Sequence, residues 1–419
     1  MRLSADTANA RFVRRPFASP LRLATGTIAD ITEATAEATV RVDGIEATGF
    51  GAIYLSDLWA WPDANLPSEV RDAAMRAYLE AACAELPALC EGAEHPLEFS
   101  ARLHARCLAD TRSPLPPLAR LVATSPLDAA VHDAAGRARG VSAFLLATES
   151  ADCPTADPCF GSRGAVAAVA NLLRFPPAST IDASVVVGKG DSLESVDPWV
   201  ADRGIHTLKL KIGGTDPGED AARCIAVHDH AMAIGCRVPR LSVDANCATP
   251  DAATVARFLD ELGGSRPDVL QSIDSIEQPT NRDIQSHPFA WGDIARRVPL
   301  LLDEGWIDWS GLQEAERQGW NGLAVKTCKG HGFALLAAAW AHERGWHLRM
   351  MDLTNPGIAA IQSLAFAAHL PGVPWIECNA IQYTPTAHAQ LPTQFRSALD
   401  PRGGLHAVPT NLVGLGSKA

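Results

Sequence analysis

The spacing of hydrophobic and polar positions changes twice along this chain. From about Leu21 to Trp61 apolar and polar residues alternate, which is typical of antiparallel strands, and Asp43-Gly44 between two alternating runs predicts a hairpin. Apolar residues then recur at helical spacing, and the last helix of this part is expected to end at Gly140. The three predicted helices cover residues 70–86, 97–110 and 125–140. Strands followed by helices indicate an α+β unit.

From about residue 180 short apolar segments alternate with helical ones. A stretch rich in Ala, Ser, Pro and Gly, at about 144–178, is expected to be a long connection before this part. Eight predicted strands and seven intervening helices favour a closed parallel barrel. The strands are expected at residues 180–188, 206–214, 240–246, 270–279, 299–305, 322–330, 346–354 and 374–380, with clear helices at 217–235, 250–264, 332–345 and 355–372.

The length of 419 residues exceeds the size at which one hydrophobic core stops growing, so we expect two domains and a tail. Residues 1–150 are expected to form an α+β capping domain and residues 151–380 a (β/α)₇β modified TIM barrel. Residues 381–419 contain no eighth barrel helix and are expected to pack back on the capping domain.

The composition limits the kinds of partner and the cellular compartment that we expect for this protein. A net charge of -12 argues against nucleic acid or an anionic membrane as a partner, and no run of 18 apolar residues predicts a membrane span. No apolar segment follows Arg11, Arg14 and Arg15, so they do not indicate a targeting signal. The ten cysteines include no C-x-x-C pair and are expected to be reduced, which favours a cytoplasmic protein.

Charged and polar residues recur where the predicted barrel strands end. Catalytic groups of such barrels lie at these carboxyl ends, and spacings of 23 to 33 residues between successive positions correspond to one strand and one helix each. We therefore expect these residues to converge on one mouth. They are Lys209, Lys211, Asp244, Asn246, Glu277, Asp303, Glu304, Lys326, Lys329, Asp352 and Glu377.

The residue types indicate a metal flanked by bases. Asp244, Glu277 and Asp303 follow three consecutive strands, and three carboxylates without His or Cys suit Mg²⁺ better than Zn²⁺. Strands two and six of an eight-stranded barrel are opposite one another, so Lys211 and Lys326 are expected to face a substrate carboxylate from two sides. Lys209 is expected to lower the pKa of Lys211, the candidate base, and to contact that carboxylate.

The ordered motifs K-L-K, D-A-N, E-Q-P, L-L-D-E and V-K-T-C-K-G resemble those of the enolase superfamily, and most nearly its muconate-lactonizing enzyme subgroup. The segment SPLDAAVHDAAGRARGVSAFLL is also similar to the last helix of that family's capping domain. The resemblance implies Mg²⁺ on Asp244, Glu277 and Asp303. It also implies acid/base roles for Lys211 and Lys326, with Asn246 and Lys209 as supporting groups.

The sequence departs from parts of this superfamily. The mandelate racemase branch pairs a His on strand seven with an Asp on strand six, whereas this chain has Lys326 on strand six and no His in RMMDLT. The segment LTNPG also differs from the loop of the cycloisomerases and dipeptide epimerases. The substrate therefore stays open.

We expect Mg²⁺-dependent abstraction of the α-proton of a small carboxylate, in a homo-oligomeric enzyme. Glu377, beside Trp375 and Ile376, is expected to have a raised pKa and to protonate a leaving hydroxyl, which favours dehydration of a hydroxy acid or acid sugar over racemisation, epimerisation or cycloisomerisation. Two other functional classes stay open. One is an aldolase that forms a Schiff base on Lys326, and the other is a non-catalytic relative of such enzymes.

Several assignments near the mouth stay open. Glu304 is expected to support the metal ligands, and Asp352 either to contact a cationic substrate group or to cap the next helix. His331, in a glycine-rich turn after Lys329, is expected to be solvated. Trp59 and Trp61 are equally compatible with a lid over the site and with the core.

Overall fold

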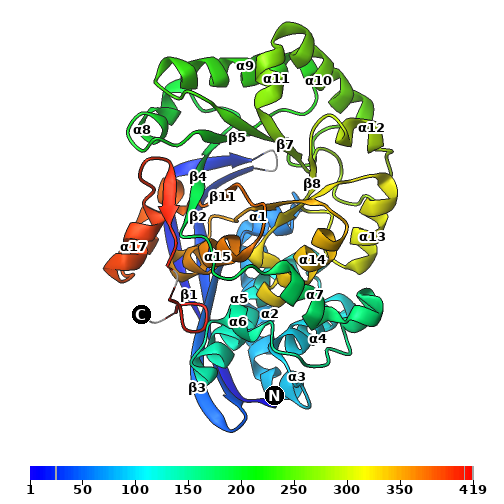
Figure 1. Cartoon of the computed structure of the whole chain (residues 1–419), viewed down its shortest axis with the longest axis vertical. Coiled ribbons are helices and arrows are strands. Elements are labelled where there is room, and N and C mark those ends of the chain that lie inside the picture. Colours follow the sequence, from blue (N-terminus) through cyan, green and yellow to red (C-terminus); the bar gives the residue numbers. More distant parts are fainter. Residues whose placement is uncertain (24–25, 410, 418–419) are drawn as a thin grey trace.

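The computed structural model describes residues 1–23, 26–409 and 411–417, which form a capping domain and a barrel (Figure 1). The capping sheet contains β1 (Leu3–Leu23), β2 (Gly26–Val42) and β3 (Ile45–Tyr54), all antiparallel in the order β1-β2-β3. Six helices follow it: α1 (Asp57–Ala60), α2 (Ser68–Ala84), α3 (Leu86–Cys90), α4 (Pro96–Ala109), α5 (Pro117–Arg139) and α6 (Ala143–Leu146). The predicted α+β unit is confirmed.

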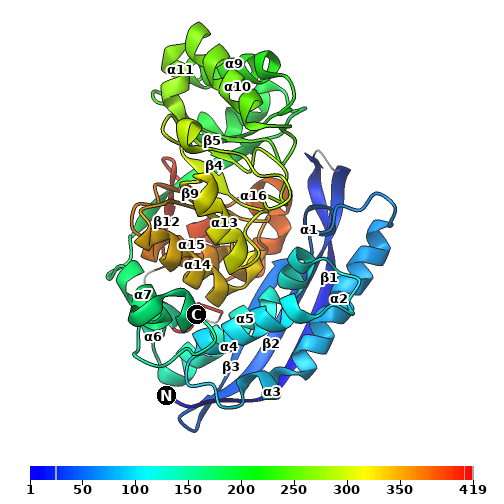
Figure 2. The same cartoon turned by 90° about the vertical axis from the view of Figure 1, so that its right-hand side faces the viewer.

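Strand β1 begins 18 residues earlier than the pattern of apolar residues predicts, at Leu3 instead of about Leu21. Its arginines pair with acids of the neighbouring strand, including Arg15 with Glu33 at 2.6 Å. Most of its side chains face solvent, so the strand lacks the regular apolar alternation that marks a half-buried strand. Beyond the sheet, β1 and β2 continue as a long hairpin beside the barrel (Figure 2).

The predicted turn and helix end are both observed. Asp43 and Gly44 link β2 to β3 with positive φ angles of 51° and 86°, as a tight hairpin requires. Helix α5 ends at Gly140, which has a φ of 65°. The same helix packs very closely on β3, because a Cβ atom at Gly49 would lie 2.2 Å from the backbone nitrogen of Ala134.

The eight predicted barrel strands are all present and parallel. They are β4 (Thr180–Val187), β5 (Thr207–Lys211), β6 (Arg240–Asp244), β7 (Ile273–Glu277), β8 (Leu300–Leu302), β9 (Gly322–Val325), β10 (His347–Met350) and β11 (Trp375–Glu377). They pair in sequence order, and β11 pairs with β4 to close the barrel. A short strand, β12 (Leu405–Ala407), pairs in the antiparallel sense with the first residues of β4, Thr180 to Asp182.

Helices surround the barrel unevenly. The outer helices are α9 (Pro217–Ala233), α10 (Ala252–Ser265), α11 (Pro267–Ser272), α13 (Trp309–Gln318), α14 (His331–Glu343) and α15 (Gly357–His369). Among the described residues, the α-helices that directly precede β5 and β8 are the four-residue α8 (Asp197–Val200) and α12 (Gly292–Ala295). The expected connection at 144–178 contains α6 and another helix, α7 (Ala165–Leu172), whose apolar residues pack against α14. After β11 come α16 (Ala380–Tyr383) and α17 (Thr393–Leu399).

Two features join the capping domain to the rest of the chain. Helix α14 lies against α4 and α5, and its residues from His331 to Ala341 are buried. Asp133 of α5 accepts hydrogen bonds from the backbone nitrogen atoms of Phe50 (3.0 Å) and Leu415 (2.7 Å). The last described residues therefore contact the capping domain as well as the barrel.

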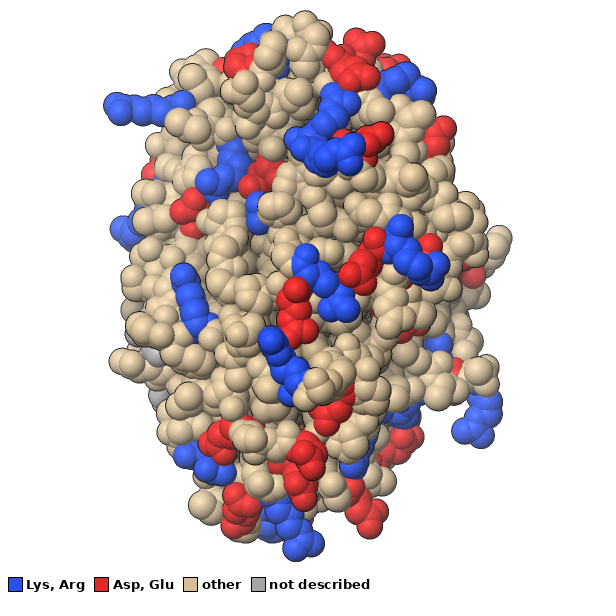
Figure 3. Space-filling model, turned by 45° about the vertical axis from the view of Figure 1, so that its right-hand side comes forward, with Lys and Arg blue, Asp and Glu red and all other residues tan. Residues whose placement is uncertain are grey.

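The surface bears charges of both signs. On the face drawn in Figure 3, acidic and basic side chains are interspersed among uncharged residues, as expected from many small ion pairs. Among the described residues, no helix has the length and apolar character needed to cross a membrane.

Candidate active site

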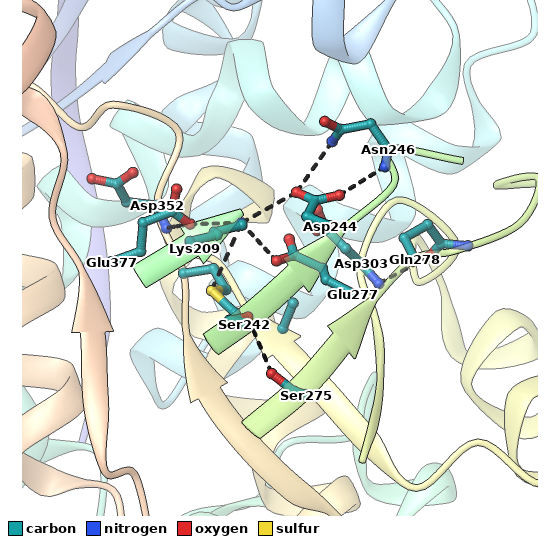
Figure 4. A network of polar contacts seen from close by, with 12 residues as sticks. Lys209, Ser242, Asp244, Asn246, Ser275, Glu277, Gln278, Asp303, Asp352 and Glu377 are labelled. Carbon is teal, nitrogen blue, oxygen red and sulfur yellow. Dashed lines mark hydrogen bonds and ion pairs between the residues drawn. The ribbon is translucent and has the colours of Figure 1, made fainter. Parts of the chain in front are cut away.

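The carboxyl ends of the barrel strands bring predicted residues to one mouth, and Figure 4 shows Lys209 among the acids Asp244, Glu277 and Glu377. Lys211, Asp244 and Glu277 occupy equivalent register positions on β5, β6 and β7, because Lys211 pairs with Asp244 and Asp244 with Glu277. Asp303 follows β8 directly, and Lys326 follows β9. The expected convergence is therefore observed in the fold.

Lys209 occupies the centre of this network. Its Nζ lies 2.6 Å from Glu277 Oε2, 2.9 Å from Glu377 Oε2 and 3.4 Å from Asp244 Oδ2. Although burial opposes the charged form, these carboxylates hold the pKa of Lys209 well above its usual value. Its charge is thus compensated by three acids, so the geometry does not support the expectation that Lys209 acts as a free cation lowering the pKa of Lys211.

Two further lysines approach the acids from opposite sides. Lys211 Nζ contacts Asp244 Oδ2, whereas Lys326 Nζ lies 2.5 Å from Asp303 Oδ2 and 3.4 Å from Glu277 Oε1. Strand β5 and strand β9 are four positions apart in a closed sheet of eight parallel strands, which places them across the barrel. A substrate held between these two amines would be reached on both faces.

Glu277 has the properties of a metal ligand. Both of its carboxylate oxygens are buried, and each faces an ammonium group, Oε2 at 2.6 Å from Lys209 Nζ and Oε1 at 3.4 Å from Lys326 Nζ. Burial raises the pKa of Glu277 to about 8, and the charge of Lys209 offsets this only in part. Buried carboxylate oxygens beside the acids Asp244 and Asp303 are the type of ligand that a divalent cation prefers.

The carboxylates of Asp244, Glu277 and Asp303 do not converge on a single point. Within the described residues no three His, Cys, Asp or Glu side chains are arranged closely enough to hold a metal ion. The physical reason is that the ammonium groups of Lys209, Lys211 and Lys326 lie among the carboxylates and balance their charge. A cation with the preference of Mg²⁺ for oxygen ligands would have to displace these contacts.

Asp303 is held by residues around it. Gln278, with a positive φ of 29°, accepts hydrogen bonds from the backbone nitrogen atoms of Asp303 (2.9 Å) and Gly305 (3.1 Å). Lys329 Nζ donates to the backbone oxygen of Asp303 (2.5 Å) and lies 3.9 Å from the centre of the Trp306 ring. Burial lowers the pKa of Lys329 to about 8. Lys329 therefore fixes the position of the Asp303 backbone. Gln278 was not among the predicted site residues, although it belongs to the E-Q-P motif that the sequence analysis singled out.

Asp352 and Glu377 are held by neighbouring groups. Asp352 accepts hydrogen bonds from the backbone nitrogen atoms of Thr354 (2.9 Å), Asn379 (3.1 Å) and Asn355 (3.4 Å), so it shapes the loop before α15 and does not cap that helix. Burial, reinforced by Glu377, raises the pKa of Asp352 to about 7. Glu377 receives hydrogen bonds from Lys209 (2.9 Å) and from the Asn379 side chain (3.1 Å). It is placed as an ion-paired carboxylate, not as a proton donor.

A cavity of about 50 Å³ lies over these groups. The barrel contributes Lys209, Lys211, Lys326, Asp352, Glu377 and Asn246, which has a φ of 45° and donates from its backbone nitrogen to Asp244. The capping domain contributes an apolar wall of Phe17, Ile28, Ile31 and Trp59. Phe17 was not predicted, because the beginning of β1 gave no strand signal, whereas Ile28 and Ile31 lie in a predicted strand region whose position over the site the sequence did not show.

Trp59 covers the site, as one of the two sequence interpretations proposed. Its ring centre lies 4.8 Å from Lys326 Nζ, and its Nε1 donates a hydrogen bond to Glu304 Oε1 (2.9 Å). Glu304 thus supports the lid and does not line the cavity. The prediction of a solvated His331 is wrong: this residue is buried against His132 and Phe144 between the two domains.

Comparison with known proteins agrees with this architecture. The family model described as "Enolase C-terminal domain-like" matches residues 191–418, more than half of the chain. A hydrophobic dipeptide epimerase from Citrifermentans bemidjiense is 27% identical over 266 residues, which are 63% of this chain and 59% of that protein. The matched part thus spans less than two thirds of that relative.

Solved structures show the same fold at low identity. A dipeptide epimerase from Enterococcus faecalis, complexed with Mg and the dipeptide L-Leu-L-Tyr, superposes with a TM-score of 0.69, 16% identity and coverage of 99% of both chains. A muconate lactonizing enzyme from Pseudomonas fluorescens, complexed with muconolactone, gives a TM-score of 0.65 and 19% identity, covering 99% of this chain and 96% of that one.

Proposed function

Because the chain belongs to the enolase C-terminal domain-like family and is similar to two dipeptide epimerases, we propose that it is a metal-dependent racemase or epimerase of a carboxylate substrate. The observation that carries this proposal is the placement of Lys211 and Lys326 on opposite sides of the acids Asp244, Glu277 and Asp303. Inverting a stereocentre requires a base on one face of the α-carbon and an acid on the other.

The proposed reaction assigns one role to each lysine. With one stereoisomer bound, Lys211 acts as the base that takes the α-proton, and the C–H electron pair moves toward the substrate carboxylate. The ammonium of Lys326 then gives a proton to the opposite face of the same carbon, and the roles reverse for the other isomer. A Mg²⁺ ion on Asp244, Glu277 and Asp303 would supply positive charge where the carboxylate becomes more negative.

The apolar wall favours a substrate with hydrophobic side chains, and we propose a dipeptide. Phe17, Ile28 and Ile31 line the cavity across from the charged groups, and Leu353 adds a further apolar surface. The relative from Citrifermentans bemidjiense is a hydrophobic dipeptide epimerase, which supports the same choice. The cavity of about 50 Å³ holds only small molecules, so Trp59 or the hairpin must move outward when a dipeptide enters.

Dehydration, which the sequence favoured, has weaker support than isomerisation. It depends on Glu377 as a proton donor, whereas this carboxylate pairs with Lys209 and accepts a hydrogen bond from Asn379. The named relatives also favour isomerisation. We therefore place epimerisation ahead of elimination.

Incubation with dipeptides in D₂O tests the proposal. L-Leu-L-Tyr and similar hydrophobic dipeptides should gain one deuterium at a single α-carbon as the second diastereomer forms. NMR measures both the deuterium content and the diastereomer ratio. Loss of water from a hydroxy acid, with no exchange into any dipeptide, would replace epimerisation by elimination.

A further inference from the structure

A second and larger hollow lies beside the reaction cavity. It has a volume of about 700 Å³, within the usual range of small-molecule sites. The capping domain forms one side through residues 60–65 and 116–118, and the loops after β7 and β8 form the other through residues 282–285 and 304–311. We call this hollow the lateral groove.

The lining of the lateral groove combines apolar surface with negative charge. Trp61, Pro62, Pro117, Leu118, Ile284 and Ile307 contribute the apolar part. Four carboxylates, of Asp63, Asp283, Glu304 and Asp308, face only one guanidinium, that of Arg282. The Arg282 Nη1 also donates a hydrogen bond to the backbone oxygen of Trp59 (2.9 Å). The groove is therefore suited to a ligand that is both cationic and apolar.

Glu304 gives the groove a specific polar group. Only 3% of its surface is exposed, and one carboxylate oxygen, Oε1, accepts the hydrogen bond of Trp59 Nε1. The other oxygen, Oε2, is buried and has no hydrogen-bond partner among the described residues. A buried carboxylate oxygen without a donor is costly unless a ligand supplies one. The three aspartates differ from it, because each binds a backbone amide of its own loop.

Trp59 separates the lateral groove from the reaction cavity. Its ring lines the cavity, whereas Glu304, Ala60 and Trp61 line the groove. We propose that the lateral groove is a second binding site, for a ligand carrying a primary ammonium group on an apolar body, with the buried carboxylate of Glu304 as its charged partner. This assignment does not depend on the reaction proposed above, because the groove shares no lining residue with the reaction cavity.

Calorimetric titration with 2-phenylethylammonium at neutral pH tests this proposal. The probe joins one ammonium to one aromatic ring, and the neutral analogue 2-phenylethanol has the same ring without the charge. We expect the ammonium to bind measurably and the alcohol to bind at least about tenfold more weakly, because a charge-assisted hydrogen bond is lost. Equal binding of both compounds would overturn the proposal.

Three variants locate the binding. Glu304→Gln keeps an acceptor for Trp59 but removes the negative charge, and Ala64→Trp fills the groove from an exposed position of the capping loop. Both should raise the dissociation constant about tenfold or more. Asp352→Asn, which removes an acid from the reaction cavity, should leave it unchanged. Retained binding in either groove variant, or binding lost in Asp352→Asn, would overturn the assignment.

Discussion

Arg349 and Asp274 form a two-pronged ion pair across the barrel interior. Arg349 Nε lies 2.7 Å from Asp274 Oδ2 and Nη2 lies 3.0 Å from Oδ1, although β10 and β7 are separated by two strands. Asp274 is an extra residue in β7, because Leu241 pairs with Ile273 and Ser242 with Ser275. Such a bulge redirects a side chain. Trp375 Nε1 also donates to the same carboxylate at 3.1 Å.

Replacement of Asp274 by Asn should lower stability strongly. The change keeps the shape but leaves the guanidinium of Arg349, only 8% exposed, without its charged partner. We expect a loss of about 3–5 kcal/mol in the free energy of unfolding, measured by urea denaturation. The control is Asp293→Asn, which breaks the exposed ion pair with Arg296 and should change stability by less than about 1 kcal/mol. If both substitutions lower the free energy of unfolding by the same amount, the ion pair of Arg349 and Asp274 stabilises the fold no more than an exposed pair does.

Removal of either lysine should separate the two halves of the proposed reaction. Lys211→Ala and Lys326→Ala should each lower epimerisation by about 10²-fold or more, since each removes an acid/base group. Each variant should still exchange the α-proton of one diastereomer with solvent deuterium, and the retained diastereomer should differ between the two. If both variants exchange both diastereomers, the lysines do not serve opposite faces.

Metal removal should abolish the activity. Treatment with EDTA followed by dialysis should lower the rate at least about 10²-fold, and added Mg²⁺ should restore it, because the acids of Asp244, Glu277 and Asp303 are the groups we expect to hold the ion. Mg²⁺ should also raise the melting temperature of the stripped protein but not that of Glu277→Gln. An EDTA-treated sample with full activity would refute metal dependence.

Acid should destabilise the interface between the domains. Burial lowers the pKa of His331 and of His132 to about 3, so both stay neutral in the folded protein while unfolded histidine takes up a proton near pH 6.5. The stability is full above pH 6.5 and falls as pH decreases toward 3, by on the order of 1 kcal/mol per pH unit for each histidine. Burial raises the pKa of Asp128, so this carboxyl acts in the opposite sense at pH values above its ordinary pKa of 3.8.

The variant His331→Leu should make the stability less dependent on pH. Denaturation between pH 7 and pH 5 should show a slope smaller by about one proton than in the unmodified protein. Exposed His287 provides the control, since His287→Gln should leave the slope unchanged. An unaltered slope in His331→Leu would mean that this histidine is already able to protonate in the folded state.

The barrel could be predicted well because two sequence signals coincide in it. Apolar strands recur at one strand–helix spacing, and charged residues lie at the ends of all but the first, as Asp244 and Glu277 illustrate. The pairing within the site could not be predicted. That Lys209 would have three carboxylate partners depends on distances between side chains of β5, β6, β7 and β11, which the order of residues does not contain.

The errors elsewhere have physical causes too. His331 lies between Gly330 and Gly332, which resemble a solvated turn in the sequence. The structure uses Gly332 for close packing, since a Cβ atom there would lie 2.1 Å from Ser100 Oγ of α4. The first part of β1 was missed because exposed arginines and other polar residues occupy positions where a half-buried strand would show apolar residues.

The wall over the acids and lysines has a consequence for how such a protein can change over generations. Phe17, Ile28 and Ile31 belong to a hairpin of the capping domain, whereas every charged group of the cavity belongs to the barrel. Substitutions in the hairpin can therefore change which substrate side chains the cavity accepts, while the residues that transfer the proton stay the same. The residues that would set substrate preference and those that would carry the chemistry are at least 178 residues apart, from Ile31 to Lys209, so selection can act on one group while the other is inherited intact.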